Sequence, residues 1–142
     1  MNQAAIFIPF FAMMLLTIIV WFYMYVLRLS YFKREKIDPQ SIGTMREMYD
    51  RVPARIHLPS ENLVNLFELP ILFYGVCVYL YVTQQVDMAY LFLAYGFVFL
   101  RAGHSLIHCT YNRVMQRFLF YSFSSLLLWV MIIRAGISAL GI

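Results

Sequence analysis

The N-terminal part of the chain is a long run without charge. No lysine, arginine, aspartate or glutamate occurs before Arg28. The run from Ala4 to Leu27 is long enough to cross a bilayer, because a membrane-spanning helix needs about 20 apolar residues. It lacks the basic segment that opens a cleavable signal peptide. We therefore predict a first membrane span that is retained in the protein.

The composition of the whole chain agrees with a membrane protein. Of its 142 residues, 63% are hydrophobic and only 13% are charged, whereas a soluble domain has about 45–50% apolar and about 25% charged residues. These values exclude a soluble globular domain. They also exclude a disordered chain, which requires the opposite composition. The length accommodates about four helical spans with short connections and leaves no room for a second, soluble domain.

Three further apolar runs support this count. The second run, from Asn62 to Val86, contains one charged residue, Glu68. The third run, from Met88 to His108, also contains one, Arg101, and a fourth begins at Phe118. We predict an all-α integral membrane four-helix bundle that forms a single domain over residues 1–142, with spans at about residues 4–28, 61–84, 88–110 and 116–138 and a polar loop at about 29–60.

The basic residues predict the orientation of these spans. Nine of the eleven lysine and arginine residues lie in the first loop or flank the third. Because basic loops are retained in the cytoplasm, we predict that these two loops are cytoplasmic and that both termini are extracytoplasmic. The same rule accounts for the net charge of +4 without a nucleic-acid partner. The compact loops fit a bacterial inner membrane.

Glu68 and Arg101 are charged residues inside predicted spans. A charge within the bilayer is costly, so such residues usually face the bundle and have a partner. The second and third spans are antiparallel neighbours, which brings Glu68 and Arg101 to a similar depth. We expect a buried ion pair between them. This pair either fixes the helix register alone or belongs to a functional site.

Other polar residues follow helical spacing on the last three spans. Residues three or four apart lie on one face of a helix, and each span carries one such face near its cytoplasmic end. The faces consist of Asn65 and Glu68 on the second span, Arg101, His104 and His108 on the third, and Arg113, Arg117 and Tyr121 on the fourth. Together they predict a polar cavity, rich in arginine and histidine, that suits an anionic ligand.

Each of these residues also has a simpler interpretation. His104 and His108 could ligate a metal ion if Glu68 joined them, but histidines inside membranes more often bond across helices, and we expect no metal site. Arg113 and Arg117 could be interfacial anchors that extend to the lipid headgroups. Most phenylalanine and tyrosine residues are expected to face lipid.

Two motifs resemble those of the MAPEG family, the membrane-associated proteins in eicosanoid and glutathione metabolism. The first is Asn65-x-x-Glu68 followed closely by Pro70, at the start of the second span. The second is Arg101-x-x-His104, with arginines trailing into the fourth span. The motif spacing is most similar to that of the glutathione transferase and prostaglandin E synthase members. The likeness covers almost the whole chain.

This resemblance implies a homotrimer of four-helix bundles. In catalytic members glutathione, as co-substrate, lies between neighbouring subunits near the cytoplasm, and a lipophilic electrophile or lipid approaches from the bilayer. The resemblance assigns Arg117 the catalytic role of stabilising the glutathione thiolate. The residues implied in glutathione binding are Arg28, Asn65, Glu68, Arg101, His104, His108, Arg113 and Tyr121.

Three residues depart from the pattern of the catalytic members. Val64 precedes Asn65 where many of them have a basic residue, His108 replaces a tyrosine, and Phe118 replaces a serine. The family also contains a non-catalytic member that binds a fatty acid. Two functions therefore stay open: a membrane-embedded glutathione-dependent transferase or peroxidase, and a non-catalytic lipid-binding or scaffold protein.

Overall fold

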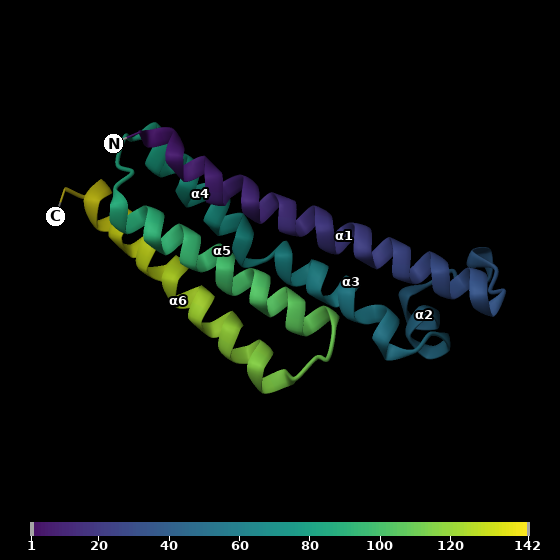
Figure 1. The fold of residues 1–142 in the computed structure, drawn as a ribbon. Helices are drawn as coiled ribbons and strands as arrows, with labels where there is room; N and C mark the ends of the chain where they lie inside the picture. The colour runs from purple at the N-terminus through teal and green to yellow at the C-terminus, as the bar shows by residue number, and fades with distance from the viewer. Residues whose placement is uncertain (1, 142) are drawn as a thin grey trace.

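A computed structural model describes residues 2–141 of the protein. It is an elongated bundle in which long helices run side by side, with both ends of the chain at one end of the bundle and α2 at the other (Figure 1). Short 3-10 turns lie at Gln3–Ile6 and Pro39–Ser41. The α-helices are α1 (Phe7–Glu35), α2 (Met45–Arg51), α3 (Ala54–Leu66), α4 (Leu69–Val82), α5 (Met88–Cys109) and α6 (Val114–Ala139).

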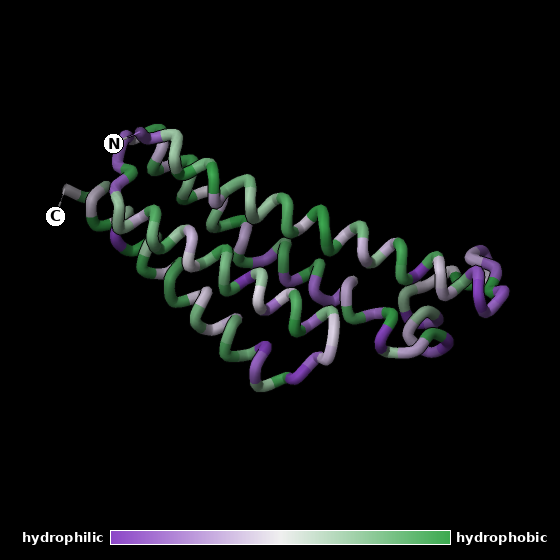
Figure 2. Tube along the Cα trace, viewed as in Figure 1, coloured by the Kyte–Doolittle hydropathy of each residue, from purple (hydrophilic) through white to green (hydrophobic). Residues whose placement is uncertain are grey.

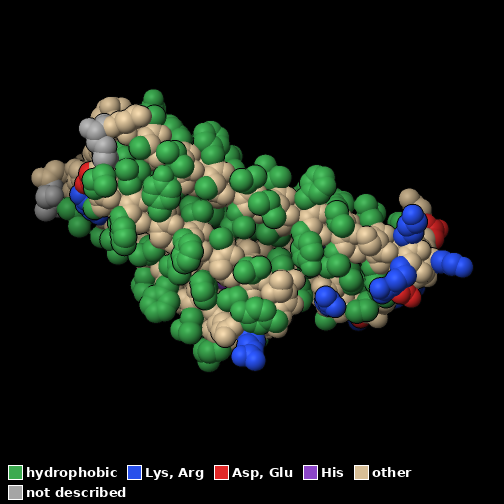
Figure 3. All heavy atoms as spheres, viewed as in Figure 1, with side chains coloured by type: hydrophobic (Ala, Val, Ile, Leu, Met, Phe, Trp, Pro, Cys, Tyr) green, Lys and Arg blue, Asp and Glu red, His purple; other side chains and the backbone are tan. Residues whose placement is uncertain are grey.

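Four helical segments are long and apolar enough to cross a membrane. They are α1 with the preceding turn, α3 together with α4, α5, and α6. Hydrophobic residues cover these helices along their length, and hydrophilic residues concentrate in the connections (Figure 2). The apolar side chains also dominate the outer surface (Figure 3). The protein is thus a multi-pass integral membrane protein with an all-helical fold.

The interior of the bundle is apolar over most of its length. Phe73 of α4 and Phe97 of α5 stack with ring centroids 4.6 Å apart, and both are fully buried. Met13 of α1 and Met131 of α6 are also fully buried in the same cluster. This core holds the four spans together and leaves polar side chains to gather nearer the α2 end.

The second span is two helices, whereas the sequence suggested one continuous run. α3 ends at Leu66 and α4 begins at Leu69. Pro70 lacks a backbone N–H, and in a continuous helix its ring would clash with the carbonyl of Leu66 four residues earlier. Glu68 lies at this break, at the N-terminal cap of α4, and its backbone is non-helical (φ −95°, ψ −98°).

The break overturns the expected ion pair between Glu68 and Arg101. Glu68 lies where the chain leaves the helix, and its side chain is exposed. Among the described residues, the ion pairs do not include one between Glu68 and Arg101. The predicted pair rested on the similar depth that Glu68 and Arg101 would have if the second span were one continuous helix. At the helix break, the charge of Glu68 still acts on Arg101 electrostatically, but without direct contact.

α5 and α6 approach closely at two glycines. A Cβ atom on Gly103 would lie 2.3 Å from the Phe120 ring, and one on Gly96 would lie 2.8 Å from Leu127. Both distances are well inside van der Waals contact. Small residues at helix contacts are a common way for membrane helices to pack tightly. This contact sets the separation of the two helices that carry most of the polar residues.

Replacing Gly103 with alanine should destabilise the bundle by about 1–3 kcal/mol, because the Phe120 ring has to move to admit the methyl group. Thermal denaturation in detergent measures the effect. Gly75→Ala is the matched control, since a Cβ there meets nothing within 4 Å. Equal denaturation temperatures for the two variants would show that α5 and α6 are not packed this closely.

Arg134 is a charged residue near the C-terminal end of α6. It forms an ion pair with Asp87, in which Arg134 Nη1 donates to Asp87 Oδ1 at 2.9 Å, and its guanidinium lies 4.2 Å from the centre of the Tyr90 ring. The hydrogen bonds from Arg134 lower the pKa of Asp87 from 3.8 to about 2. The carboxylate therefore stays ionised at neutral pH, and the pair fastens α6 to the start of α5.

Candidate functional site

Arg101 is fully buried between α3, α5 and α6. Its Nη2 donates a hydrogen bond to the backbone carbonyl of Asn65. That carbonyl is available because the last four carbonyls of a helix have no partner within it, and α3 ends at Leu66. The guanidinium also lies 5.1 Å from the centre of the Tyr121 ring. The break in the second span thus creates the acceptor that holds Arg101.

The rest of the Arg101 guanidinium is not satisfied by the protein. Its Nε and Nη1 atoms are buried and have no hydrogen-bond partner among the described residues. Buried polar groups in proteins are almost always bonded, and exceptions call for an explanation. These two nitrogen atoms carry three N–H bonds, which are suited to receive the oxygen atoms of an anionic ligand.

His104 connects α5 to the start of α6. Its Nδ1 lies 3.0 Å from the backbone carbonyl of Arg117. A carbonyl oxygen only accepts hydrogen bonds, so Nδ1 carries the proton and, in the neutral ring, Nε2 keeps a lone pair. Nε2 is buried and has no partner. His104 therefore positions the backbone of Arg117 and presents a free acceptor.

The side chain of Arg117 is fixed by the turn between α5 and α6. Its Nη1 donates to Oδ1 of Asn112 at 2.8 Å. Asn112 has a positive φ of 48°, which asparagine tolerates better than most residues. An arginine has five N–H donors, so the others stay available for a ligand. Asn112 was not among the predicted site residues, and its place in a short polar turn before the trailing arginines was its only signal in the sequence.

Four predicted site residues line one cavity of about 190 Å³. They are Asn65, His104, Arg117 and Tyr121, and Phe118 and Val114 complete the wall. Ligand pockets usually have about 300–1,000 Å³. A single chain therefore provides a polar recess that is smaller than a full binding pocket for a small molecule.

His108 lies beside this cavity without lining it. The residue is buried, and its ring is 5.6 Å from the ring of His104 and nearly perpendicular to it. Its Nε2 lies 3.6 Å from Oε2 of Glu61, which is too long for a hydrogen bond. Both ring nitrogens are buried and lack hydrogen-bond partners. The approach of Glu61 to His108 did not follow from the sequence pattern.

Besides Arg101 and His108, three further predicted site residues do not line the cavity. Arg113 is exposed at the cap of α6, and Glu68 is exposed at the helix break. Arg28 lines a separate cavity at the end of α1. The described residues also contain no group of three or more histidine, cysteine, aspartate or glutamate side chains that could hold a metal ion.

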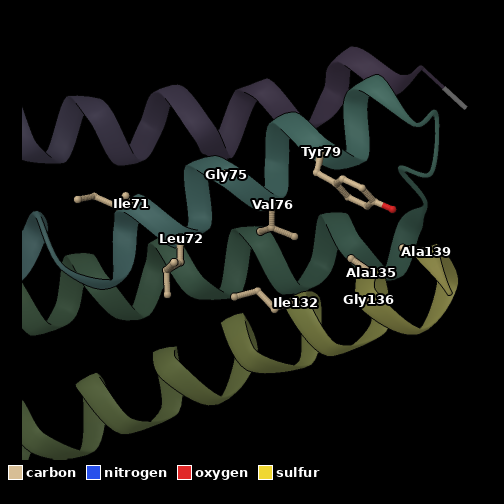
Figure 4. Close-up of a pocket in the computed structure, with 9 residues that line it drawn as sticks. All are labelled: Ile71, Leu72, Gly75, Val76, Tyr79, Ile132, Ala135, Gly136 and Ala139. Atoms are coloured by element: carbon tan, nitrogen blue, oxygen red, sulfur yellow. The ribbon is translucent and has the colours of Figure 1, made fainter.

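An apolar groove lies between α4 and α6 (Figure 4). It shares no lining residue with the polar cavity. It has a volume of about 410 Å³. Gly75 and Gly136 leave open space, since a Cβ on either would meet nothing within 4 Å. The larger lining side chains are Ile71, Leu72, Val76, Tyr79 and Ile132. The groove suits a hydrocarbon chain.

The fold and the site define a multi-pass membrane bundle with arginine and histidine side chains gathered between its helices. The model of the MAPEG family matches residues 6–137, and the chain belongs to this family. This result confirms the family expected from the two motifs. The protein is thus a membrane protein of the glutathione and eicosanoid metabolism type. No curated protein and no solved structure matches the chain significantly.

Proposed function

We propose that the protein is a glutathione-dependent transferase or peroxidase that acts on hydrophobic electrophiles or lipid hydroperoxides. The observation that carries the proposal is the convergence of Arg117, His104 and Tyr121 on one cavity beside the buried Arg101. Glutathione is an anion with two carboxylates and a thiol. The unpartnered N–H groups of Arg101 supply donors for a carboxylate, and Asn65 supplies an amide in the same wall.

Arg117 is the proposed catalytic residue. A thiol with a pKa of about 8.5 is a weak nucleophile at neutral pH, and a fixed cation favours the reactive thiolate. Asn112 holds the Arg117 guanidinium, and His104 holds its backbone. The thiol proton can pass to the free Nε2 of His104. At an electrophilic carbon, the thiolate sulfur then forms the C–S bond as the leaving group departs with its electron pair and takes up the proton from His104. With a hydroperoxide, the sulfur bonds to the terminal oxygen, the O–O bond breaks, and the alkoxide takes up that proton and leaves as an alcohol. The resulting glutathione sulfenic acid condenses with a second glutathione to give the disulfide and water.

The proposed assembly is a homotrimer. A recess of about 190 Å³ in one chain is too small for a whole tripeptide, so the rest of the pocket is assigned to a neighbouring subunit. Arg113 and Glu68, which are exposed in one chain, are candidates to complete it. Native mass spectrometry in detergent should detect three chains. A monomer that binds glutathione with full affinity would contradict this assembly.

The proposed location is a bacterial inner membrane, with both termini extracytoplasmic. The basic residues gather at the α2 end of the bundle, and both chain ends lie at the other end (Figures 1 and 3). A cysteine introduced at Gly43 should react with a membrane-impermeant label only after the cells are opened. A C-terminal reporter that is active only in the cytoplasm would contradict this orientation.

Calorimetric titration of the purified protein with glutathione tests the function directly. The alternative is a non-catalytic lipid-binding or scaffold protein, and three observations favour it. The apolar groove between α4 and α6 is larger than the polar cavity. Phe118 lines the polar cavity without offering a hydroxyl, and Val64 is 62% exposed where many catalytic members have a basic residue. Absence of glutathione binding would favour this alternative.

A further inference from the structure

A second cavity with polar and apolar walls lies at the α2 end of α1. It has a volume of about 270 Å³ and shares no lining residue with the glutathione cavity proposed above. Arg28 and Phe32 of α1 form one side, and residues 39–48, which fold back against α1, form the other. Arg28 is the first charged residue of the chain, at the point where the uncharged run ends.

The guanidinium of Arg28 has no partner within the described part of the chain. Its Nε is buried and unbonded, and no ion pair or ring contact involves it. Glu47 is near the cavity, but its Oε2 accepts hydrogen bonds from the backbone N–H groups of Gly43 and Thr44. This carboxylate is committed to the cap of α2. The cavity therefore holds a cation without a counter-ion.

The walls of this cavity are built by packed side chains. Phe32 of α1 and Met48 of α2 are buried in a small apolar cluster with Val52 and Ile56. Thr44 and Glu47 form a capping box, in which Thr44 Oγ1 accepts from the backbone N–H of Glu47 at 3.2 Å. The hydroxyl hydrogen of Thr44 remains able to donate into the cavity. These contacts preform a recess that carries a fixed charge.

An aromatic stripe leads from Arg28 along the outside of α1. Trp21 and Tyr25 precede Arg28 by seven and three residues, so all three lie on one face of the helix. Trp21 is 45% exposed and Tyr25 is 42% exposed, and their ring centroids are 4.6 Å apart. Aromatic rings of this kind sit where a membrane changes from apolar to polar. The two rings lie within two helical turns of Arg28, where the uncharged run of the chain ends, and an aromatic belt is expected at such a place.

We propose that this cavity binds one anionic phospholipid, with its phosphate on Arg28 and Thr44 and an acyl chain along Tyr25 and Trp21. A guanidinium is well suited to a phosphate, which it can bind through two parallel hydrogen bonds. The surrounding segment, residues 28–55, carries seven basic and four acidic residues, a net charge of +3 (7 − 4), which attracts an anionic lipid. Lysine and arginine side chains are visible at this end of the molecule (Figure 3).

Native mass spectrometry of delipidated protein tests the site, with phosphatidylglycerol and phosphatidylcholine added in turn. The wild type should retain one phosphatidylglycerol per chain in preference to phosphatidylcholine. Arg28→Gln should weaken phosphatidylglycerol binding about tenfold or more, the loss expected for charge-assisted hydrogen bonds.

Lys33→Gln is the control, because Lys33 is exposed on the same helix and its substitution removes the same charge. It should weaken binding about fivefold or less, as a surface charge does. Equal effects of the two variants, or equal retention of both lipids, would overturn the proposal.

Two further measurements distinguish a phospholipid from free phosphate as the ligand of the cavity. Trp21→Ala combined with Tyr25→Ala should weaken phosphatidylglycerol binding, and inorganic phosphate should compete only weakly with it. If the double variant binds the lipid unchanged and inorganic phosphate displaces it, the cavity takes a free anion and the lipid assignment is wrong. Displacement of the lipid by glutathione would assign Arg28 to the glutathione site instead. Failure of glutathione to bind at all would leave the lipid site unaffected.

Discussion

Replacing Arg117 with alanine should abolish the thiolate absorbance of bound glutathione while weakening its binding only modestly. The carboxylates of glutathione would still be bound by Arg101 and its neighbours, so most of the affinity should remain. The thiolate would lose the cation that stabilises it. Conjugation of a hydrophobic electrophile should fall about 100-fold or more at neutral pH, as when a single charge-stabilising donor is removed from an active site. Ultraviolet difference spectra and conjugation rates, recorded as a function of pH, measure both effects.

Two variants sharpen this experiment. Arg117→Lys should keep part of the thiolate signal, since lysine supplies a charge without the planar fork of donors. Arg46→Ala removes an exposed charge from α2, outside the cavity, and should leave the signal unchanged. A bound thiol that titrates as it does in free glutathione would contradict the role of Arg117. In that case the lipid-binding alternative becomes the better account.

Phe118 explains why the thiolate should be only moderately stabilised. It lines the same cavity as Arg117 but cannot donate a hydrogen bond to sulfur. We expect slow conjugation that accelerates as the pH rises and more of the thiol ionises. The position is also exposed to 59% in a single chain. In the proposed trimer that exposed ring would lie against a neighbouring subunit or a lipophilic substrate.

Those parts of the structure that depend on local chemistry followed from the sequence. The apolar runs indicated four spans because a bilayer requires long uncharged helices. The spacing of Arg101 and His104 placed them on one face of α5, and the spacing of Arg117 and Tyr121 did the same on α6. The structure brings the last three of these residues to one cavity and stacks Arg101 over Tyr121.

The failures come from long-range geometry and from a backbone break. Pro70 interrupts the second span, and the carbonyl of Asn65, not the carboxylate of Glu68, accepts the hydrogen bond from Arg101. A sequence pattern that assumes a continuous helix cannot detect such an exchange. The pairing of Asp87 with Arg134 joins residues 47 positions apart. Only the packing of α5 against α6 brings these two together.

Replacing Arg101 with methionine should leave the ligand-free protein at least as stable as the wild type and remove its stabilisation by glutathione. Arg101 is fully buried with two unbonded nitrogens, and a buried charge with incomplete hydrogen bonding is costly by several kcal/mol. Methionine fills a similar volume without charge. The Asn65 carbonyl would lose its donor at a cost of about 1–3 kcal/mol, which the removal of the charge offsets. Thermal denaturation with and without glutathione measures both effects.

A second variant, Glu68→Gln, tests whether the Glu68 carboxylate contributes to holding Arg101 in the folded state. Glu68 is exposed and forms no ion pair with Arg101, so this substitution should change the unfolding free energy by about 0.5 kcal/mol or less. The double variant should equal the sum of the two single variants within about 0.5 kcal/mol. If Arg101→Met instead unfolds the protein and Glu68→Gln restores it, the two charges are partners in the folded state. We expect the effects of the two substitutions on the unfolding free energy to add, and glutathione to no longer stabilise the Arg101→Met variant. This result would mean that Arg101 destabilises the ligand-free bundle and serves to bind the ligand.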